Sequence, residues 1–184
     1  MNVGTDEIEF VAELLNQAGD GKIPGTDVND ADLFPYLNYA LVGWFFLVFL
    51  PRWNGTRYVV MVVCLAVSSL YAILMANVMF SSTPEESSSS GALDLLKDFS
   101  TFEGVVKLFQ NKDVVLGAWS HYVCFDLWVG YWEVEDAAEK GIPHILVVPC
   151  LFFTLMLGPT GFLMYFTLRL VFILFFNARK RKRN

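Results

Sequence analysis

The sequence predicts an all-α, polytopic membrane protein, a bundle of four transmembrane helices with an amphipathic helix before the third crossing. The first observation is composition: 55% of the 184 residues are apolar and 17% are charged, whereas a typical soluble domain is roughly 45–50% apolar and about 25% charged. The second is that the apolar residues form four blocks that are apolar all round, whereas a surface helix of a soluble protein is apolar on one stripe only. Together these observations exclude a soluble single domain and the disordered, collagen-like and disulfide-rich secreted classes.

Each block is expected to be one crossing, because about 20 apolar residues span the hydrocarbon region of a bilayer as a helix. The blocks are residues 33–50, 58–80, 114–134 and 145–168, the last with an extension to 176. The fourth is too long for one straight crossing, so we expect a bend at Gly158-Pro159 and an interfacial segment after Arg169. The chain therefore divides into an acidic segment, 1–32, a membrane domain, 33–176, and a basic tail, 177–184.

Four crossings place both termini on one side of the membrane. That side holds nine basic residues, which are Lys22, Lys97, Lys107, Lys112 and five in the tail, and the other side holds three, Arg52, Arg57 and Lys140. The positive-inside rule therefore predicts that both termini are cytoplasmic, or stromal in a plastid. A basic run directly after an apolar helix is typical of a topology signal or of contact with anionic lipid, so no nucleic-acid partner is expected.

The segment between the second and third crossings has two parts. The serine-rich run Glu85–Gly91 is typical of a flexible linker. The apolar residues of Leu93–Phe109 recur at helical spacing, which predicts an interfacial helix or a cover over the bundle. The three cysteines all lie in apolar blocks and are interpreted as small buried hydrophobic residues.

The third block contains the two residues in which chemistry could reside, His121 and Asp126. Ionisable residues near the middle of a bilayer usually face the bundle interior and have a role. The two residues are about 140° apart around a helix, so each needs a partner from another helix or a water molecule. Asp126 shares its face with Trp119, Tyr122, Gly130 and Glu133. Two interpretations stay open: hydrogen bonds that hold helices together, or an intramembrane acid–base or binding site.

Depth along the helices indicates candidate partners. Asn38 and Thr160 lie near the level of His121, and Thr154 lies near that of Asp126, whereas Arg169 is too far along its helix to neutralise Asp126. The candidate catalytic residues are His121 and Asp126, and the candidate substrate-binding residues are Trp119, Tyr122, Trp128, Asn38, Thr154, Thr160, Gly158 and Pro159. Gly161 beside the bend allows either a ligand slot or close helix packing. Spacings typical of metal ligands are absent, so neither a metal nor a cofactor is expected.

Several segments resemble the neoxanthin synthase-like family of plants, algae and bacteria. They are Leu47–Thr56 (LVFLPRWNGT), Phe102–Phe109 (FEGVVKLF), Leu116–Ala137 (LGAWSHYVCFDLWVGYWEVEDA) and Pro149–Tyr165 (PCLFFTLMLGPTGFLMY). The resemblance implies four crossings. From the plant members it also implies a place in carotenoid metabolism, at the step from violaxanthin to neoxanthin.

Two functions of different classes follow. The first is a protein that acts on or binds a carotenoid, as a cofactor-independent isomerase that turns an epoxide into an allene with one acid and one base. The alternative is a non-catalytic subunit or scaffold of a larger membrane complex. The expected partners are membrane lipid, a carotenoid and a membrane-protein complex. The resemblance implies a plastid membrane (thylakoid or envelope) or a bacterial inner membrane, and the pattern Lys180-x-Lys182 leaves the endoplasmic reticulum as an alternative.

Overall fold

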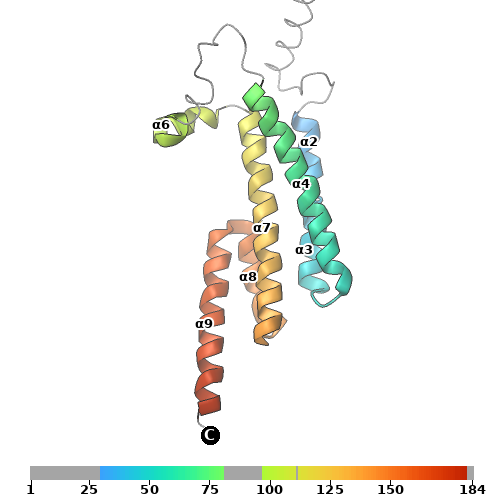
Figure 1. Cartoon of the computed structure of the whole chain (residues 1–184), viewed down its shortest axis with the longest axis vertical. Coiled ribbons are helices and arrows are strands. Elements are labelled where there is room, and N and C mark those ends of the chain that lie inside the picture. The colour runs from blue at the N-terminus through green and yellow to red at the C-terminus, as the bar shows by residue number, and fades with distance from the viewer. Residues whose placement is uncertain (1–29, 81–96, 111, 182–184) are drawn as a thin grey trace, which may run out of the picture. The chain divides into compact units, whose positions relative to one another are not determined.

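The structure, a computed structural model of the whole chain, describes residues 30–80, 97–110 and 112–181. Within these ranges the chain forms helices and turns and no strand, so the all-α class is confirmed. The helices are α2 (Asp30–Leu37), α3 (Ala40–Phe49), α4 (Asn54–Phe80), α6 (Phe102–Leu108), α7 (Lys112–Lys140), α8 (His144–Leu157) and α9 (Pro159–Arg181) (Figure 1). Most of the acidic segment, the serine-rich run and the end of the basic tail lie outside the described residues.

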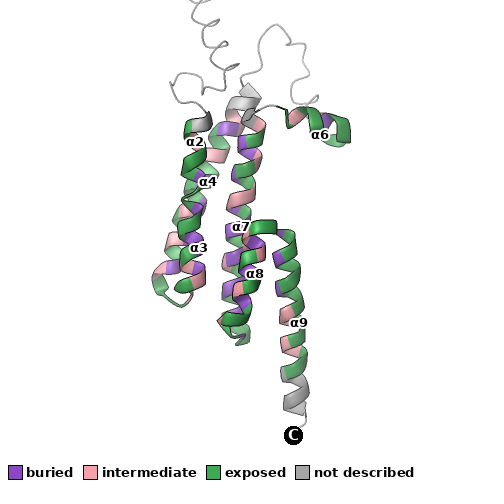
Figure 2. Cartoon of the chain, turned by 180° about the vertical axis from the view of Figure 1, so that it is seen from behind, coloured by how far each residue is buried: buried purple, intermediate pink, exposed green. Residues whose placement is uncertain are grey.

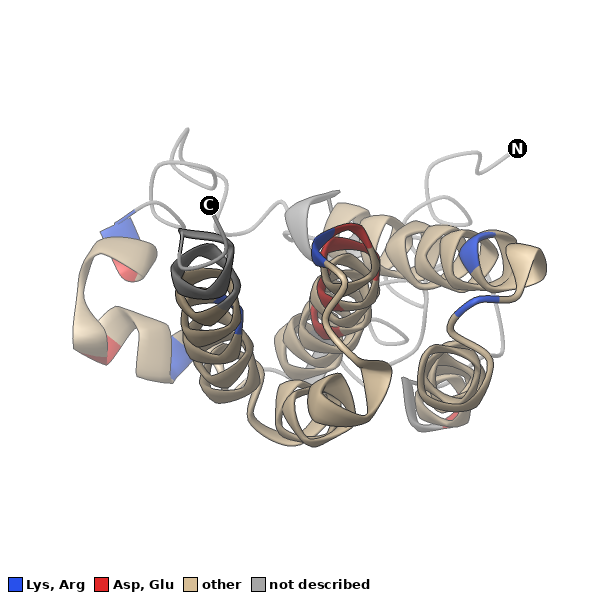
Figure 3. Ribbon diagram, turned by 90° about the horizontal axis from the view of Figure 1, so that it is seen from below, with Lys and Arg blue, Asp and Glu red and all other residues tan. Residues whose placement is uncertain are grey.

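The chain divides into two compact units. The first unit comprises Met1–Leu37 and Ser68–His121, and the second comprises Asn38–Val67 and Tyr122–Asn184. The helices α4 and α7 each contribute one part to each unit. Every acidic residue of the second unit lies on α7 (Figure 3), and that part of α7 carries the candidate site.

Aromatic contacts organise the described part of the first unit. The Phe34 ring in α2 stacks on Trp119 in α7 with ring centroids 6.2 Å apart. The Tyr71 ring in α4 lies 5.7 Å from the His121 ring in α7. Trp119 and His121, two of the residues that sequence analysis expected in a site, therefore pack against aromatic rings of other helices in this unit.

The amphipathic helix expected over 93–109 is shorter in the structure. Its last part is α6, which begins after the N-cap residue Thr101. The Thr101 side chain accepts a hydrogen bond from the Gly104 backbone N–H at 3.1 Å, and its extended backbone separates α6 from the preceding helical turn at 97–100. Residues 93–96 lie outside the described part of the chain.

The first expected crossing, 33–50, is two helices rather than one. Pro35 lies inside α2 and has no N–H to donate. After Leu37 the chain makes a turn, in which the Leu41 N–H bonds to the Asn38 carbonyl at 2.9 Å, and α3 follows. The division between the two units falls at this turn.

The second unit begins with α3 and the start of α4. The latter begins at Asn54, four residues earlier than the sequence predicts. The Thr56 hydroxyl is buried and donates to the Leu50 carbonyl at 2.6 Å, which closes the turn between the two helices. The Cys64 and Cys124 sulfurs each lie within hydrogen-bonding distance of the other residue's carbonyl, at 3.9 and 3.6 Å. All three cysteines are buried and free, as expected.

The fourth block forms a helical hairpin, so the single bent crossing expected over 145–168 is wrong. After α8 the chain reverses at Gly158, and α9 returns alongside α8 (Figure 1). Gly158 has φ +39° and ψ −92°, a backbone conformation that L residues rarely adopt. Pro159 cannot donate to the Leu155 carbonyl, so α8 ends here, and a proline is well suited to begin α9.

Helix length limits which segments can cross a membrane. Among the described residues, Asp32–Phe49 and Asn54–Ala76 are long and apolar enough to do so. The apolar parts of the hairpin helices, His144–Leu157 and Pro159–Phe175, are shorter. The 14 residues of α8 extend about 21 Å, less than the hydrocarbon thickness of about 30 Å. Much of α9 is exposed (Figure 2), and its exposed side chains include the apolar Leu163, Leu170, Leu174 and Phe175.

Candidate functional site

Three buried carboxyl groups lie on one face of α7 in the second unit. Asp126 and Asp136 are each 9% exposed and Glu133 is 0% exposed. Their spacing of seven and three residues places them within about 80° around the helix. The acidic residues Glu135 and Glu139 on the same helix are exposed. We call Asp126, Glu133 and Asp136 the α7 carboxylates.

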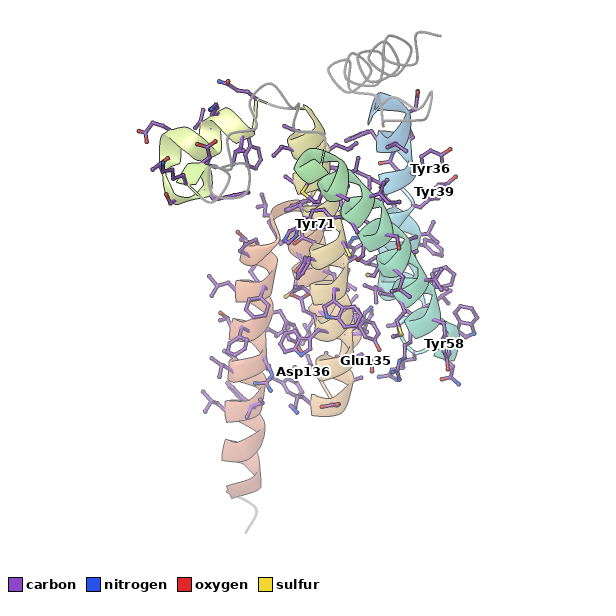
Figure 4. The ribbon with its side chains drawn as sticks, turned by 45° about the horizontal axis from the view of Figure 1, so that its top comes forward. Tyr36, Tyr39, Tyr58, Tyr71, Glu135 and Asp136 are labelled. Atoms are coloured by element: carbon purple, nitrogen blue, oxygen red, sulfur yellow. The ribbon has the colours of Figure 1, made fainter. Side chains whose placement is uncertain are left out.

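Asp136 is neutralised by groups from its own helix and from α9. The Arg169 guanidinium donates to both carboxylate oxygens, at 2.7 Å from Nε to Oδ2 and 3.3 Å from its terminal nitrogen to Oδ1. The Tyr165 hydroxyl donates to Oδ2 at 2.7 Å, and the Lys140 ammonium lies 3.9 Å from Oδ1. Figure 4 shows Asp136 on the side of α7 toward α9 and Glu135 away from it.

The electrostatics of Asp136 follow from these contacts. Asp136 lies beyond the end of the apolar 114–134 block. Burial alone would raise the pKa of its carboxyl, but the hydrogen bonds from Arg169 and Tyr165 and the nearby charges of Arg169 and Lys140 hold that pKa below its usual value. Asp136 is therefore an ionised, structural carboxylate.

Glu133 has a different environment. The Thr154 hydroxyl in α8 donates to Oε1 at 2.9 Å, while Oε2 is buried and has no hydrogen-bond partner. Thr154 is itself 0% exposed, so the bond lies in the interior of the unit. One carboxyl oxygen is thus bonded by α8, and the other is buried without a hydrogen-bond partner.

Asp126 lies against the turn of the hairpin. A Cβ atom on Gly158 would lie 2.7 Å from its Oδ1, so only a glycine allows this approach. Tyr122, one turn earlier on α7, hydrogen-bonds to the Asp126 side chain. The second oxygen, Oδ2, is buried without a partner. Asp126 therefore lies close to the N-terminus of α9, where the helix dipole favours negative charge.

An aromatic ring separates the two incompletely bonded carboxyl groups. Gly130 lies between Asp126 and Glu133 on the same face of α7. A Cβ atom there would lie 2.6 Å from the ring of Trp44, which is 5% exposed. The Trp44 ring therefore packs against Gly130, between the two carboxyl groups along α7.

The two candidate catalytic residues belong to different units. His121 belongs to the first unit, where it packs on Tyr71, and Asp126 belongs to the second, where it meets Gly158 and Tyr122. The sequence-predicted residue Trp119 also lies in the first unit. A catalytic role for His121 stays a prediction.

The remaining candidate binding residues are divided between buried and exposed positions. Thr154 is buried, and its hydroxyl donates to Glu133 rather than to Asp126. Asn38, Pro159 and Thr160 are exposed. Trp128 is 46% exposed and its ring lies 5.6 Å from that of Tyr131. Of the predicted set, Tyr122, Asp126 and Gly158 are brought together.

Close helix packing explains Gly161, and the ligand slot considered there is not supported. A Cβ atom at Gly161 would collide with the backbone nitrogen of Thr154. The glycine therefore allows α8 and α9 to approach backbone to backbone. This close approach also holds Thr154 in the position from which it bonds Glu133.

Sequence reasoning missed Glu133 and Asp136 as site residues. The available signal for Glu133 was its spacing of two helical turns from Asp126, on the face already assigned to Asp126. No comparable signal pointed to the pairing of Asp136 with Arg169. Arg169 was expected on the side of the termini, but the reversal at Gly158 brings it back to the level of Asp136.

The fold and the site define an all-helical protein that has helices of membrane-spanning length and buried carboxyl groups on one of its helices. The chain belongs to the ABA DEFICIENT 4-like family (ABA4-like), whose family model matches residues 33–165. This confirms the resemblance to the neoxanthin synthase-like proteins. Comparisons with curated proteins and with solved structures found no match.

Proposed function

We propose that this chain is a multi-pass integral membrane protein that binds a carotenoid epoxide and isomerises it to an allene, as in the step from violaxanthin to neoxanthin. Membership of the ABA4-like family supports the substrate class. The observation that carries the chemistry is the Asp126 carboxyl, buried in the second unit with Oδ2 unpartnered. An unpartnered carboxyl oxygen in apolar surroundings is costly, so its presence favours a functional role.

The isomerisation is balanced without electron transfer. A base removes a proton from the polyene carbon next to the epoxide, and the C–H electron pair forms a new double bond. The epoxide C–O bond breaks, and the oxygen takes a proton from an acid to become a hydroxyl group. In this scheme Asp126 is the base: burial disfavours its ionised form, and the hydrogen bond from Tyr122 and the nearby start of α9 offset part of that cost.

Co-expression of the full chain with violaxanthin tests this function. Chromatography of the extracted pigments should show neoxanthin. Asp126→Asn keeps the shape of the side chain but removes its basicity, so conversion should fall by about 10²–10⁴-fold. Glu135→Gln changes an exposed carboxylate on the same helix and is the matched control, which should convert normally. Normal conversion by Asp126→Asn would remove Asp126 from the mechanism.

The alternative is a non-catalytic subunit or scaffold. The observation that favours it is Asp136, whose contacts with Arg169, Tyr165 and Lys140 have a purely structural explanation. A purified wild-type chain that holds no carotenoid and forms no allene, but co-purifies with a defined membrane complex, would support this alternative. A plastid or bacterial inner membrane is the proposed location, with the endoplasmic reticulum as the alternative.

A further inference from the structure

We propose that Glu133 is the acid of this site, the group that gives a proton to the oxygen of the bound ligand, and that Thr154 is the residue that positions it. The inference rests on the proposed function, because it supplies the second of the two groups that the isomerisation needs. It concerns a residue that sequence reasoning did not single out.

The first argument is the contrast between two carboxyl groups on neighbouring turns of α7. Asp136 receives a bidentate contact from Arg169, a hydrogen bond from Tyr165 and the charge of Lys140. Glu133 is more deeply buried and receives one neutral hydrogen bond, from Thr154. A buried anion without a cation costs several kcal/mol, so Glu133 is best accommodated as a neutral carboxylic acid.

The second argument is that the Thr154 contact suits a carboxylic acid. In such a group one oxygen is a carbonyl acceptor and the other carries the proton. The Thr154 hydroxyl occupies the acceptor, Oε1, at 2.9 Å. The remaining atom, Oε2, is the one without a partner. An O–H group at Oε2 would have no acceptor within the described part of the protein, which leaves it free to donate to a ligand oxygen.

The third argument is the relation to Asp126. The two residues are seven positions apart, which is about 10.5 Å along the helix axis, and they share one face. The Trp44 ring at Gly130 lies between them. Because the epoxide oxygen and the neighbouring C–H bond lie close together in the ligand, one ligand meets both groups only where the Trp44 ring moves aside.

Proton balance completes the assignment. Glu133 loses its proton to the epoxide oxygen, and Asp126 gains one from the polyene carbon. After the allene leaves, Asp126 gives up its proton and Glu133 takes one from water, so the site returns to its starting state without an oxidant or a reductant. Thr154 touches neither reacting atom and acts only by orienting Glu133.

A labelling experiment on the full-length protein in lipid vesicles tests the protonated state without any pigment. A hydrophobic carbodiimide reacts with carboxyl groups that carry a proton, and peptide mass spectrometry locates the product. Modification of Glu133, with none at Asp136, is the expected result. Absence of modification at Glu133 under conditions that modify other carboxyl groups of the chain would overturn the assignment, whether or not the protein converts a carotenoid.

A variant experiment tests the catalytic step. Glu133→Gln can still accept the Thr154 hydrogen bond but cannot transfer a proton. It should retain the bound carotenoid, seen as its absorption band in the purified protein, while conversion falls by about 10²–10⁴-fold. Thr154→Val should lower conversion while Glu133 stays reactive toward the carbodiimide, because the lost hydrogen bond oriented the acid and did not protonate it. Thr154→Ser should restore conversion. Full conversion by Glu133→Gln would overturn the proposal, whereas a wild-type chain that binds no carotenoid would overturn the proposed function instead.

Discussion

The Thr154 hydroxyl donates to Glu133 Oε1 over 2.9 Å and joins α8 to α7 in the interior of the second unit. Both side chains are fully buried. The bond fixes the hairpin against the face of α7 that carries the buried carboxyl groups. It also leaves Oε2 as a buried atom without a hydrogen-bond partner.

Loss of the Thr154 hydroxyl should destabilise the protein. Thr154→Val leaves both oxygens of a buried carboxyl group without a partner, which costs about 1–3 kcal/mol. Thermal unfolding in detergent should show a lower midpoint for this variant. Thr167→Val is a matched control, because that hydroxyl is exposed and bonds only the Leu163 carbonyl of its own helix. Equal midpoints for the two variants would contradict the role of the interhelical bond.

The turn of the hairpin should tolerate no side chain. Gly158→Ala places a Cβ atom 2.7 Å from Asp126 Oδ1 and also strains a backbone at φ +39°. Gly141 offers a close control, because it has φ +70° and nothing lies within 4 Å of an added Cβ. Gly141→Ala should therefore cost only the left-handed backbone strain of about 1–2 kcal/mol. Gly158→Ala should unfold at a clearly lower temperature than Gly141→Ala, and the reverse order would refute the close approach.

Asp136 and Arg169 should behave as a coupled pair. Removal of either partner alone leaves the other charge partly buried and uncompensated, which is more harmful than removal of both. Asp136→Asn and Arg169→Met should each lower the unfolding midpoint more than the double variant does. Additive effects in this double-mutant cycle would show that the two side chains do not stabilise each other.

The pair of Asp136 and Arg169 also makes the stability of the folded protein depend on pH. Because the folded state lowers the pKa of Asp136, its contribution to stability is fully present above the unfolded value of about 3.9. It is lost as pH falls through the lower pKa of the folded state. Acid unfolding of Asp136→Asn should lack the loss of stability that protonation of Asp136 causes in the wild type. Coincident acid transitions for the variant and the wild type would contradict the assignment.

The hairpin also changes the expected topology. Since α9 returns alongside α8, the tail should lie on the same side of the membrane as the end of α7 rather than opposite to it. Cysteines placed at Ala138 and at Asn177 should be labelled from the same side of sealed vesicles. The four-crossing arrangement predicts labelling from opposite sides, so that result would reject the hairpin.

The hairpin reverses the expected distribution of basic residues between the two sides of the membrane. Moving the five basic residues of the tail changes the expected nine-to-three distribution to four on the side of the 81–113 segment and eight on the side of Arg52. The positive-inside rule then places the tail and the Arg52 turn in the cytoplasm or stroma. Reaction of the Ala138 and Asn177 cysteines only with a permeant reagent, in intact cells, would confirm this orientation.

The sequence by itself determined the helical class, the four apolar blocks and the family. It could do so because these depend on local properties: the length of an apolar run, its lack of polar faces, and the motifs within it. It also identified Asp126, since a carboxyl group inside an apolar block is costly wherever the helix packs. The position of Glu133 on the same face followed from helical periodicity, although its role did not.

Only the tertiary structure decided which carboxyl groups are compensated. Gly158-Pro159 is compatible with both a bend and a full reversal, so the sequence could not distinguish them. The reversal brings Arg169 and Tyr165 to Asp136 and leaves Asp126 at the turn, while the packing of α8 against α7 brings Thr154 to Glu133. These contacts join residues that are 21 to 33 positions apart. They depend on the directions in which α8 and α9 run. The packing of the helices sets these directions, and no local pattern in the sequence encodes them.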